Sequence, residues 1–247
     1  MSSPVLAAAA ARRALKRLAR PAGDFDARRY FRGTVDLRFH NVGTAAMRML
    51  ARSIHAQYAS GWTVNDAAAC ADALIVDAYL EAKAVGIELL ARYRRDFSPR
   101  LLPMWKRWLA NGHAANWATT DAICGCLIGP MLVAHGAVAS EMRQWSHHRS
   151  LWVRRASAVS LIPSLRKGVA LSLAYDVASA LHADDEDLIQ KAVGWMLREA
   201  GKADATRLER YLRRHGPAIP RTTVRYAIER FAPPRRRALL RATKDMT

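Results

Sequence analysis

The sequence predicts an all-α protein made of stacked helix pairs, and three observations lead to this fold class. Apolar residues recur three and four positions apart through most of the chain, breakers divide it at short intervals, and one four-residue segment occurs twice. No sustained alternation of apolar and polar residues suggests a strand. We therefore expect a helical repeat fold, or α-solenoid.

Helix breakers separate segments of ordinary helix length. They lie at 21–23, Gly33, Gly61, 98–99, Gly112, Gly136, Gly168, 184–185, Gly201, 216–217 and 233–234. Two helix starts carry capping signals. Thr63 stands before an Asn-Asp pair, and Asp184 with Asp185 places acids at the positive end of a helix expected over 186–199.

A short internal repeat favours a solenoid over a globular bundle. The segment Lys-Ala-Val-Gly at 83–86 recurs at 191–194, an offset of 108 residues. This offset equals three units of 36, which is close to the period of a paired-helix HEAT-type repeat. In both copies the glycine stands in mid-helix, where it lets two helices approach closely. We expect residues 1–247 to form a single HEAT-like repeat domain.

The charge predicts a polyanionic partner. The chain has 39 Lys plus Arg residues against 21 Asp plus Glu, and its formal net charge is +18. Nucleic acid is the first candidate, because guanidinium groups pair with phosphate in a fixed fork geometry and release counterions on binding. A membrane surface is the second. A concave face of stacked helix pairs that is rich in arginine is suited to duplex DNA.

The cysteines and the most apolar segment have plain structural interpretations. Cys70, Cys124 and Cys126 form no CxxC pair and lie in apolar helical patterns, so we expect small core residues in a reducing compartment and no metal site. The uncharged segment 122–140 approaches the length of a membrane span, but glycines and a proline interrupt it. A buried helix followed by a short second helix fits it better.

Three tryptophans at roughly repeat spacing are the candidate functional residues. Trp117, Trp152 and Trp195 are separated by 35 and 43 residues, and each has a polar companion one helical turn later. The companions on the same helix faces are Asp121, Arg155 and Arg198, respectively. Considered alone, each tryptophan is best explained as a core residue, and each arginine as a solvent-exposed side chain.

Three segments containing these residues resemble the AlkD-like DNA alkylation repair glycosylases. The stretch 116–121 (NWATTD) is similar to the family's Trp-x-x-x-Asp stretch, 152–158 (WVRRASA) to its Trp-x-x-Arg helix, and 194–199 (GWMLRE) to its Gly-Trp-x-Leu-Arg-Glu helix. Residues 31–33 and 81–93 resemble its N-terminal half less sharply. The resemblance implies a HEAT-like solenoid that removes cationic alkylpurines and uses no metal or organic cofactor.

The resemblance also implies roles for individual residues. Asp121 is the expected catalytic carboxylate, with Trp117 and Trp195 as aromatic walls around the deoxyribose of the lesion. Arg155 is the expected phosphate contact. The other expected DNA-binding residues are Arg154, Trp152, Phe25 and Arg198. The chain departs from the family pattern at Ala118, where many relatives carry a second acid, and at Phe25, near a family tyrosine.

The expected function is that of a monofunctional DNA glycosylase in base excision repair. The expected partner is double-stranded DNA containing alkylated purines, bound by a monomer in the bacterial cytosol or nucleoid without a membrane. Two alternatives stay open, a non-catalytic HEAT-repeat paralogue that binds nucleic acid and a protein-interaction scaffold. If the chain is a DNA glycosylase, the sequence leaves open whether it removes small methyl lesions or bulky natural-product adducts.

Overall fold

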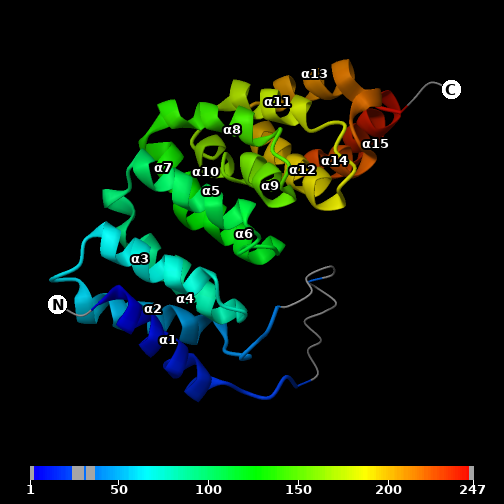
Figure 1. Cartoon of the computed structure of the whole chain (residues 1–247). Helices are drawn as coiled ribbons and strands as arrows, with labels where there is room; N and C mark the ends of the chain where they lie inside the picture. The colour runs from blue at the N-terminus through cyan, green and yellow to red at the C-terminus, as the bar shows by residue number, and fades with distance from the viewer. Residues whose placement is uncertain (1–2, 24–30, 32–36, 245–247) are drawn as a thin grey trace. The chain divides into compact units, whose positions relative to one another are not determined.

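A computed structural model describes residues 3–23, 31 and 37–244 of the chain, and the predicted all-α fold is confirmed (Figure 1). Within these residues the only extended pairing is an isolated bridge between Arg38 and Tyr79. The helices form two compact units, Met1–Leu127 (unit 1) and Ile128–Thr247 (unit 2). The expectation of a single domain over 1–247 stays a prediction.

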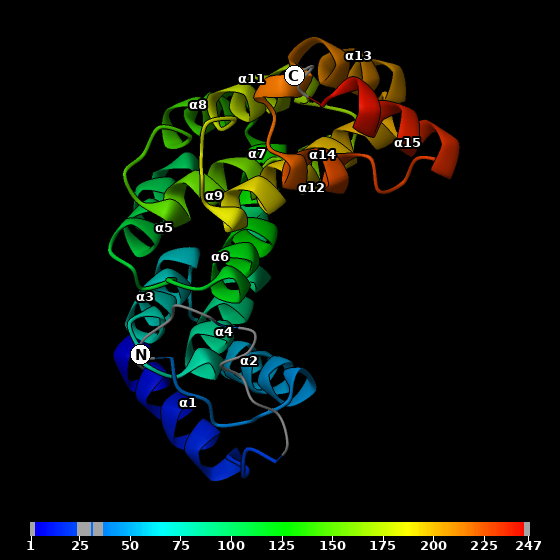
Figure 2. The same ribbon diagram turned by 90° about the vertical axis from the view of Figure 1, so that its right-hand side faces the viewer.

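Unit 1 contains the N-terminal helices. Helix α4 packs against α2 and α3, and α1 packs against α3 (Figure 2). The elements of this unit are α1 (Pro4–Leu18), α2 (Thr44–Tyr58), α3 (Val64–Ile75), α4 (Leu80–Leu90), the 3₁₀ segments η2 (Ala91–Asp96) and η3 (Pro99–Leu101), α5 (Leu102–Ala110) and α6 (Trp117–Ile123). A π-helical turn, η4 (Cys124–Ile128), follows α6 directly.

Unit 2 is organised around α12 (Asp187–Ala203), which packs against α9 and α14. The other elements of this unit are α7 (Gly129–Ala134), η5 (Gly136–Ser140), α8 (Glu141–Trp145), α9 (Leu151–Val159), α10 (Ile162–Leu165), α11 (Leu171–Ala180), α13 (Ala205–His215), η6 (Gly216–Ala218), α14 (Arg221–Ala227) and α15 (Pro233–Ala242).

The two glycines of the repeated Lys-Ala-Val-Gly segment lie at tight helix contacts, each within its own unit. A Cβ atom on Gly86 of α4 would stand 3.1 Å from Leu74 Cβ on α3. A Cβ atom on Gly194 of α12 would stand 2.4 Å from Tyr226 Cβ and 2.8 Å from the Thr223 carbonyl oxygen on α14. The predicted role of these glycines, a close approach between two helices, is confirmed.

Polar contacts repeat at the interval expected for helix pairs. In unit 1, Arg107 pairs with Asp72, 35 residues away, at 2.9 Å. In unit 2, Arg143 pairs with Asp176 at 2.6 Å, and Thr223 donates to the Gln190 carbonyl at 3.0 Å; both separations are 33 residues. Each contact joins an element to its counterpart about one helix pair away, as in a solenoid.

The predicted helix starts are correct at one site and shifted at the other. Thr63 caps α3 in a capping box, in which Asp66 Oδ2 accepts from the Thr63 backbone N–H at 2.8 Å. Helix α12 begins at Asp187 rather than at residue 186, because Asp184 Oδ1 accepts from the Glu186 N–H and holds residues 184–186 in a turn.

Two of the three cysteines are core residues, as expected, and the apolar segment forms a partly buried helical run. Cys70 and Cys124 are buried, Cys126 is half-buried, and the described residues contain no cluster of three potential metal ligands. The helical run Trp117–Ala134 is long and apolar enough to cross a membrane by length and composition, and half of it is buried inside the protein. The short 3₁₀ helix η5 follows it, as the expected short second helix.

Candidate active site

The first turn of α6 presents Trp117 and, one turn later, Asp121. Asn116 is the N-cap of this helix, and its Oδ1 accepts from the Thr119 N–H at 2.8 Å. Trp117 is 38% exposed, although the large aromatic side chains of neighbouring α5, Trp105 and Trp108, are fully buried. The predicted pair therefore lies on one face of one helix, with an indole ring open to solvent.

A buried lysine anchors the loop that leads into α6. Lys83 of α4 is 7% exposed, and its Nζ donates to the His113 carbonyl at 2.8 Å and to the Ile75 carbonyl at 2.6 Å. Burial lowers the pKa of Lys83, and the carboxylate of Asp77 opposes that shift. Since Thr120 also donates to the Ala114 carbonyl at 2.8 Å, the loop is tied both to α4 and to α6 itself.

Phe31, which is not among the predicted site residues, stacks on Trp117. The Phe31 and Trp117 ring centroids are 5.5 Å apart, with an interplanar angle of 11°. Phe31 also lies 5.6 Å from the Phe39 ring. The motif around Phe31 was noted in the sequence, but its 86-residue separation from Trp117 carries no local signal for the contact.

The π-helical turn η4 begins immediately after α6. Such turns are rare and occur frequently at functional sites, because the extra residue alters which side chains share a face. In this turn Gly125 is exposed, and a Cβ atom there would have no neighbour within 4 Å. The surface at Gly125, four residues after Asp121, is therefore open.

In unit 2, α9 carries three of the predicted DNA-binding residues. Trp152 is half-buried. Arg155 is 6% exposed, and its Nη1 donates to the Leu188 carbonyl of α12 at 2.5 Å. Arg154 pairs with Asp184 at 2.6 Å and also donates to the His148 and Arg149 carbonyls. Both arginines thus contribute hydrogen bonds to unit 2, and their DNA contacts stay predictions.

Helix α12 carries Trp195 and Arg198 one turn apart. Trp195 is half-buried beside Gly194. Arg198 Nη1 pairs with Glu229, and its Nε lies 3.8 Å from Glu199. Glu199 is 2% exposed; burial alone would raise its pKa, but hydrogen bonds from Lys202 and Arg166 outweigh that effect and lower it. Arg198 therefore stands in an ion-pair network.

The structure brings the predicted residues together in two groups. Trp117 and Asp121 share α6 in unit 1, whereas α9 and α12, which carry the others, pack together in unit 2. Phe25 lies outside the described residues.

The fold and these residues define a class of protein: an all-α helical-repeat protein in which one helix carries an exposed tryptophan and, one turn later, an aspartate. Comparison with known proteins narrows the class. A solved structure described as a predicted DNA alkylation repair enzyme from Enterococcus faecalis is similar to the chain, with a TM-score of 0.71. The two are 16% identical, and the alignment covers 92% of this chain and 96% of that one. The likeness supports the HEAT-like fold.

The family described as DNA alkylation repair enzyme matches residues 11–231. The chain belongs to this family. No curated protein sequence gives a significant match.

Proposed function

We propose that the chain is a DNA glycosylase that hydrolyses the N-glycosidic bond of purines alkylated at N3 or N7. The observation that carries the proposal is the pairing of Asp121 with an indole ring exposed at the start of α6, in a member of the DNA alkylation repair enzyme family. The net charge of +18 supports binding to DNA, because a strongly basic protein gains affinity by releasing counterions from phosphates.

One carboxylate suffices for this reaction because the leaving group is already charged. A glycoside with a neutral leaving group needs a proton from an acid, with a second carboxylate on the other face of the sugar. A purine alkylated at N3 or N7 is a cation and leaves as a neutral base. The absence of an acid at Ala118, beside Trp117, is therefore compatible with the proposal.

Asp121 is proposed to stabilise the sugar cation. As the C1′–N bond breaks, its electrons go to the base and positive charge develops on the deoxyribose. A fixed carboxylate beside that charge contributes about 3–4 kcal/mol in comparable electrostatic sites. Asp121 also orients a water molecule, whose oxygen bonds to C1′ while one of its protons passes to the carboxylate or to solvent.

Trp117 is proposed to contact the deoxyribose with its ring face. An indole face attracts a nearby cation by about 0.5–2 kcal/mol, depending on desolvation. Phe31 stacks on Trp117 and would hold the indole plane in place. Trp195 is proposed as a second aromatic contact with the lesion, as the family resemblance implies.

The experiment is base release from duplex DNA containing 7-methylguanine or 3-methyladenine. Asp121→Asn keeps the size of the side chain but removes its charge, so we expect at least a hundredfold slower release with DNA affinity retained. Asp185→Asn is the matched control, because Asp185 is exposed and forms no ion pair within the described residues. It should release base at the wild-type rate.

The other outcomes separate the alternatives. Full activity in Asp121→Asn would remove this residue from the mechanism. Tight, salt-dependent DNA binding without base release from any alkylated duplex would favour a non-catalytic nucleic-acid-binding paralogue. Undetectable DNA affinity at low salt would favour a protein-interaction scaffold. Parallel assays with small and bulky N3 or N7 adducts then define the lesion class.

A further inference from the structure

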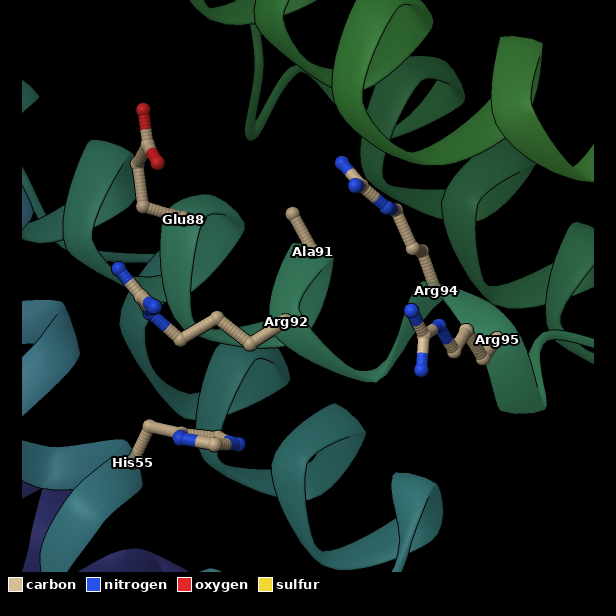
Figure 3. A pocket seen from close by; sticks show the side chains of 6 residues that line it. All are labelled: His55, Glu88, Ala91, Arg92, Arg94 and Arg95. Atoms are coloured by element: carbon tan, nitrogen blue, oxygen red, sulfur yellow. The ribbon is translucent and has the colours of Figure 1, made fainter.

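A basic cavity in unit 1 lies apart from the residues predicted to carry the chemistry. It measures about 430 Å³ and is lined by His55 of α2, by Glu88 of α4, and by Ala91, Arg92, Arg94 and Arg95 of η2 (Figure 3). Arg94 and Arg95 lie on one side of Ala91, and Arg92, Glu88 and His55 lie on the other (Figure 3). Three guanidinium groups from four consecutive residues thus border one small cavity.

Among the described residues, these three arginines have no carboxylate partner. Within the described part of the chain, Arg92, Arg94 and Arg95 are exposed and form no ion pair or hydrogen bond. By contrast, nine other arginines each pair with an acid: Arg12, Arg48, Arg107, Arg143, Arg154, Arg166, Arg198, Arg213 and Arg235.

The single acid of the cavity is already neutralised. Glu88 Oε1 accepts from Arg48 Nε at 3.0 Å, and Arg48 is on α2, outside the lining. The guanidinium groups of the cavity therefore keep their full positive charge for an external anion. A phosphate oxygen is the anion whose geometry best matches the fork of an arginine.

Two side chains of the cavity, Glu88 and Arg94, act on a residue of the helical run that carries Asp121. Burial raises the pKa of Cys126, Glu88 adds to that rise, and Arg48 and Arg94 oppose it, so these side chains lie within electrostatic range of Cys126. Cys126 follows Asp121 by five residues, about 7 Å along a helix.

We infer that this cavity is a phosphodiester-binding site that holds the DNA backbone. The inference rests on the proposed action on DNA. The arginine cluster would fix the register of the strand relative to Asp121, since backbone contacts position a protein on DNA without reading the sequence.

The first test measures the affinity of Arg94→Ala/Arg95→Ala for an undamaged duplex at several salt concentrations. Loss of one bound phosphate lowers the slope of log K against log salt by about 0.9. We expect that change, with affinity about tenfold weaker at low salt. The matched control is Arg13→Ala/Arg17→Ala on α1, two exposed arginines that also form no ion pair within the described residues. It should show a smaller loss of affinity.

The second test locates the phosphate. Single methylphosphonate linkages, which are uncharged, are placed one at a time along the strand that carries the lesion. Wild-type protein should lose affinity at one linkage, and Arg94→Ala/Arg95→Ala should lose nothing further there. Such non-additivity identifies a direct partner. Glu88→Gln should bind more tightly than wild type, because it removes the anion that neutralises Arg48 and so leaves one more uncompensated positive charge beside the cavity.

An unchanged salt slope in Arg94→Ala/Arg95→Ala, or equal sensitivity of wild type and variant to every methylphosphonate, would overturn the inference. Circular dichroism of each variant establishes that it is folded. Failure of the proposed function is a separate result, because it appears as missing base release by wild-type protein whereas the phosphate contact is measured by binding alone.

Discussion

Replacement of Lys83 by methionine should destabilise the protein far more than the same replacement of Lys191, the corresponding lysine of the repeated Lys-Ala-Val-Gly segment. Lys83 is 7% exposed and donates to two carbonyl oxygens, at 2.6 and 2.8 Å. Hydrogen bonds from charged groups contribute about 1.5–3 kcal/mol each, and the substitution leaves both carbonyls without this donor. Methionine fills similar space and avoids burying an ammonium group, which offsets part of the loss.

The expected net effect is a loss of about 2–4 kcal/mol in the free energy of unfolding. Lys191 provides the control, because its side chain is 41% exposed and pairs only with Asp187 at 2.6 Å within the same helix. Such a pair contributes about 0.3–0.5 kcal/mol. Urea denaturation followed by far-ultraviolet circular dichroism measures both variants. Equal unfolding midpoints for Lys83→Met and Lys191→Met would refute the assigned role of the buried lysine.

Lys83→Met should also change the pH dependence of stability and the rate of the proposed base release. Because burial lowers the pKa of Lys83 in the folded state, the unfolded chain binds more protons between that pKa and the ordinary value of 10.5. The free energy of unfolding of the wild type should therefore rise as the pH rises between these two pKa values. Lys83→Met should not show this rise. Base release should also fall, because the loop before Trp117 loses its anchor to α4.

Three further predictions concern unit 2. Gly194→Ala should lower the free energy of unfolding by about 1–3 kcal/mol in urea denaturation, because the added Cβ overlaps Tyr226 and the Thr223 carbonyl; an unchanged or raised midpoint would contradict the tight contact. Burial, aided by His215, lowers the pKa of His182 to about 4, so stability should rise by up to about 3 kcal/mol between pH 4 and 6.5, and His182→Gln should flatten that rise. Glu199→Gln should lower the thermal midpoint, because Lys202 and Arg166 lose their shared anion; an unchanged midpoint would show that the network contributes little.

Much of the fold was predictable because it depends on local signals. Glycine in mid-helix predicted a close approach at both Gly86 and Gly194, and Thr63 predicted a capping box. The turn between α3 and α4, at residues 76–79, was missed. It contains neither glycine nor proline, and it is held by contacts such as the hydrogen bond from the Tyr79 N–H to Asp77.

The candidate site was predictable in its local part only. Helical spacing placed Trp117 and Asp121 on one face of α6, and the structure agrees. The stacking of Phe31 and the anchoring by Lys83 depend on contacts across 86 and 30 residues, which no local pattern reports. Arg155, whose sequence context suggests a surface cation, is buried, and a carbonyl of the neighbouring helix compensates by accepting its hydrogen bond.

The regular spacing of polar contacts bears on how the chain folds. Residues that bond to each other across neighbouring helix pairs are mostly 30 to 36 positions apart, as Arg154 is from Asp184 and Trp108 from Asp72. A topology with so few distant pairings has low contact order, which favours rapid folding. Structure in such a chain spreads outward from a nucleus by nearest-neighbour coupling. Fraying of the last helix, α15, should therefore leave amide hydrogen exchange in α9 almost unchanged.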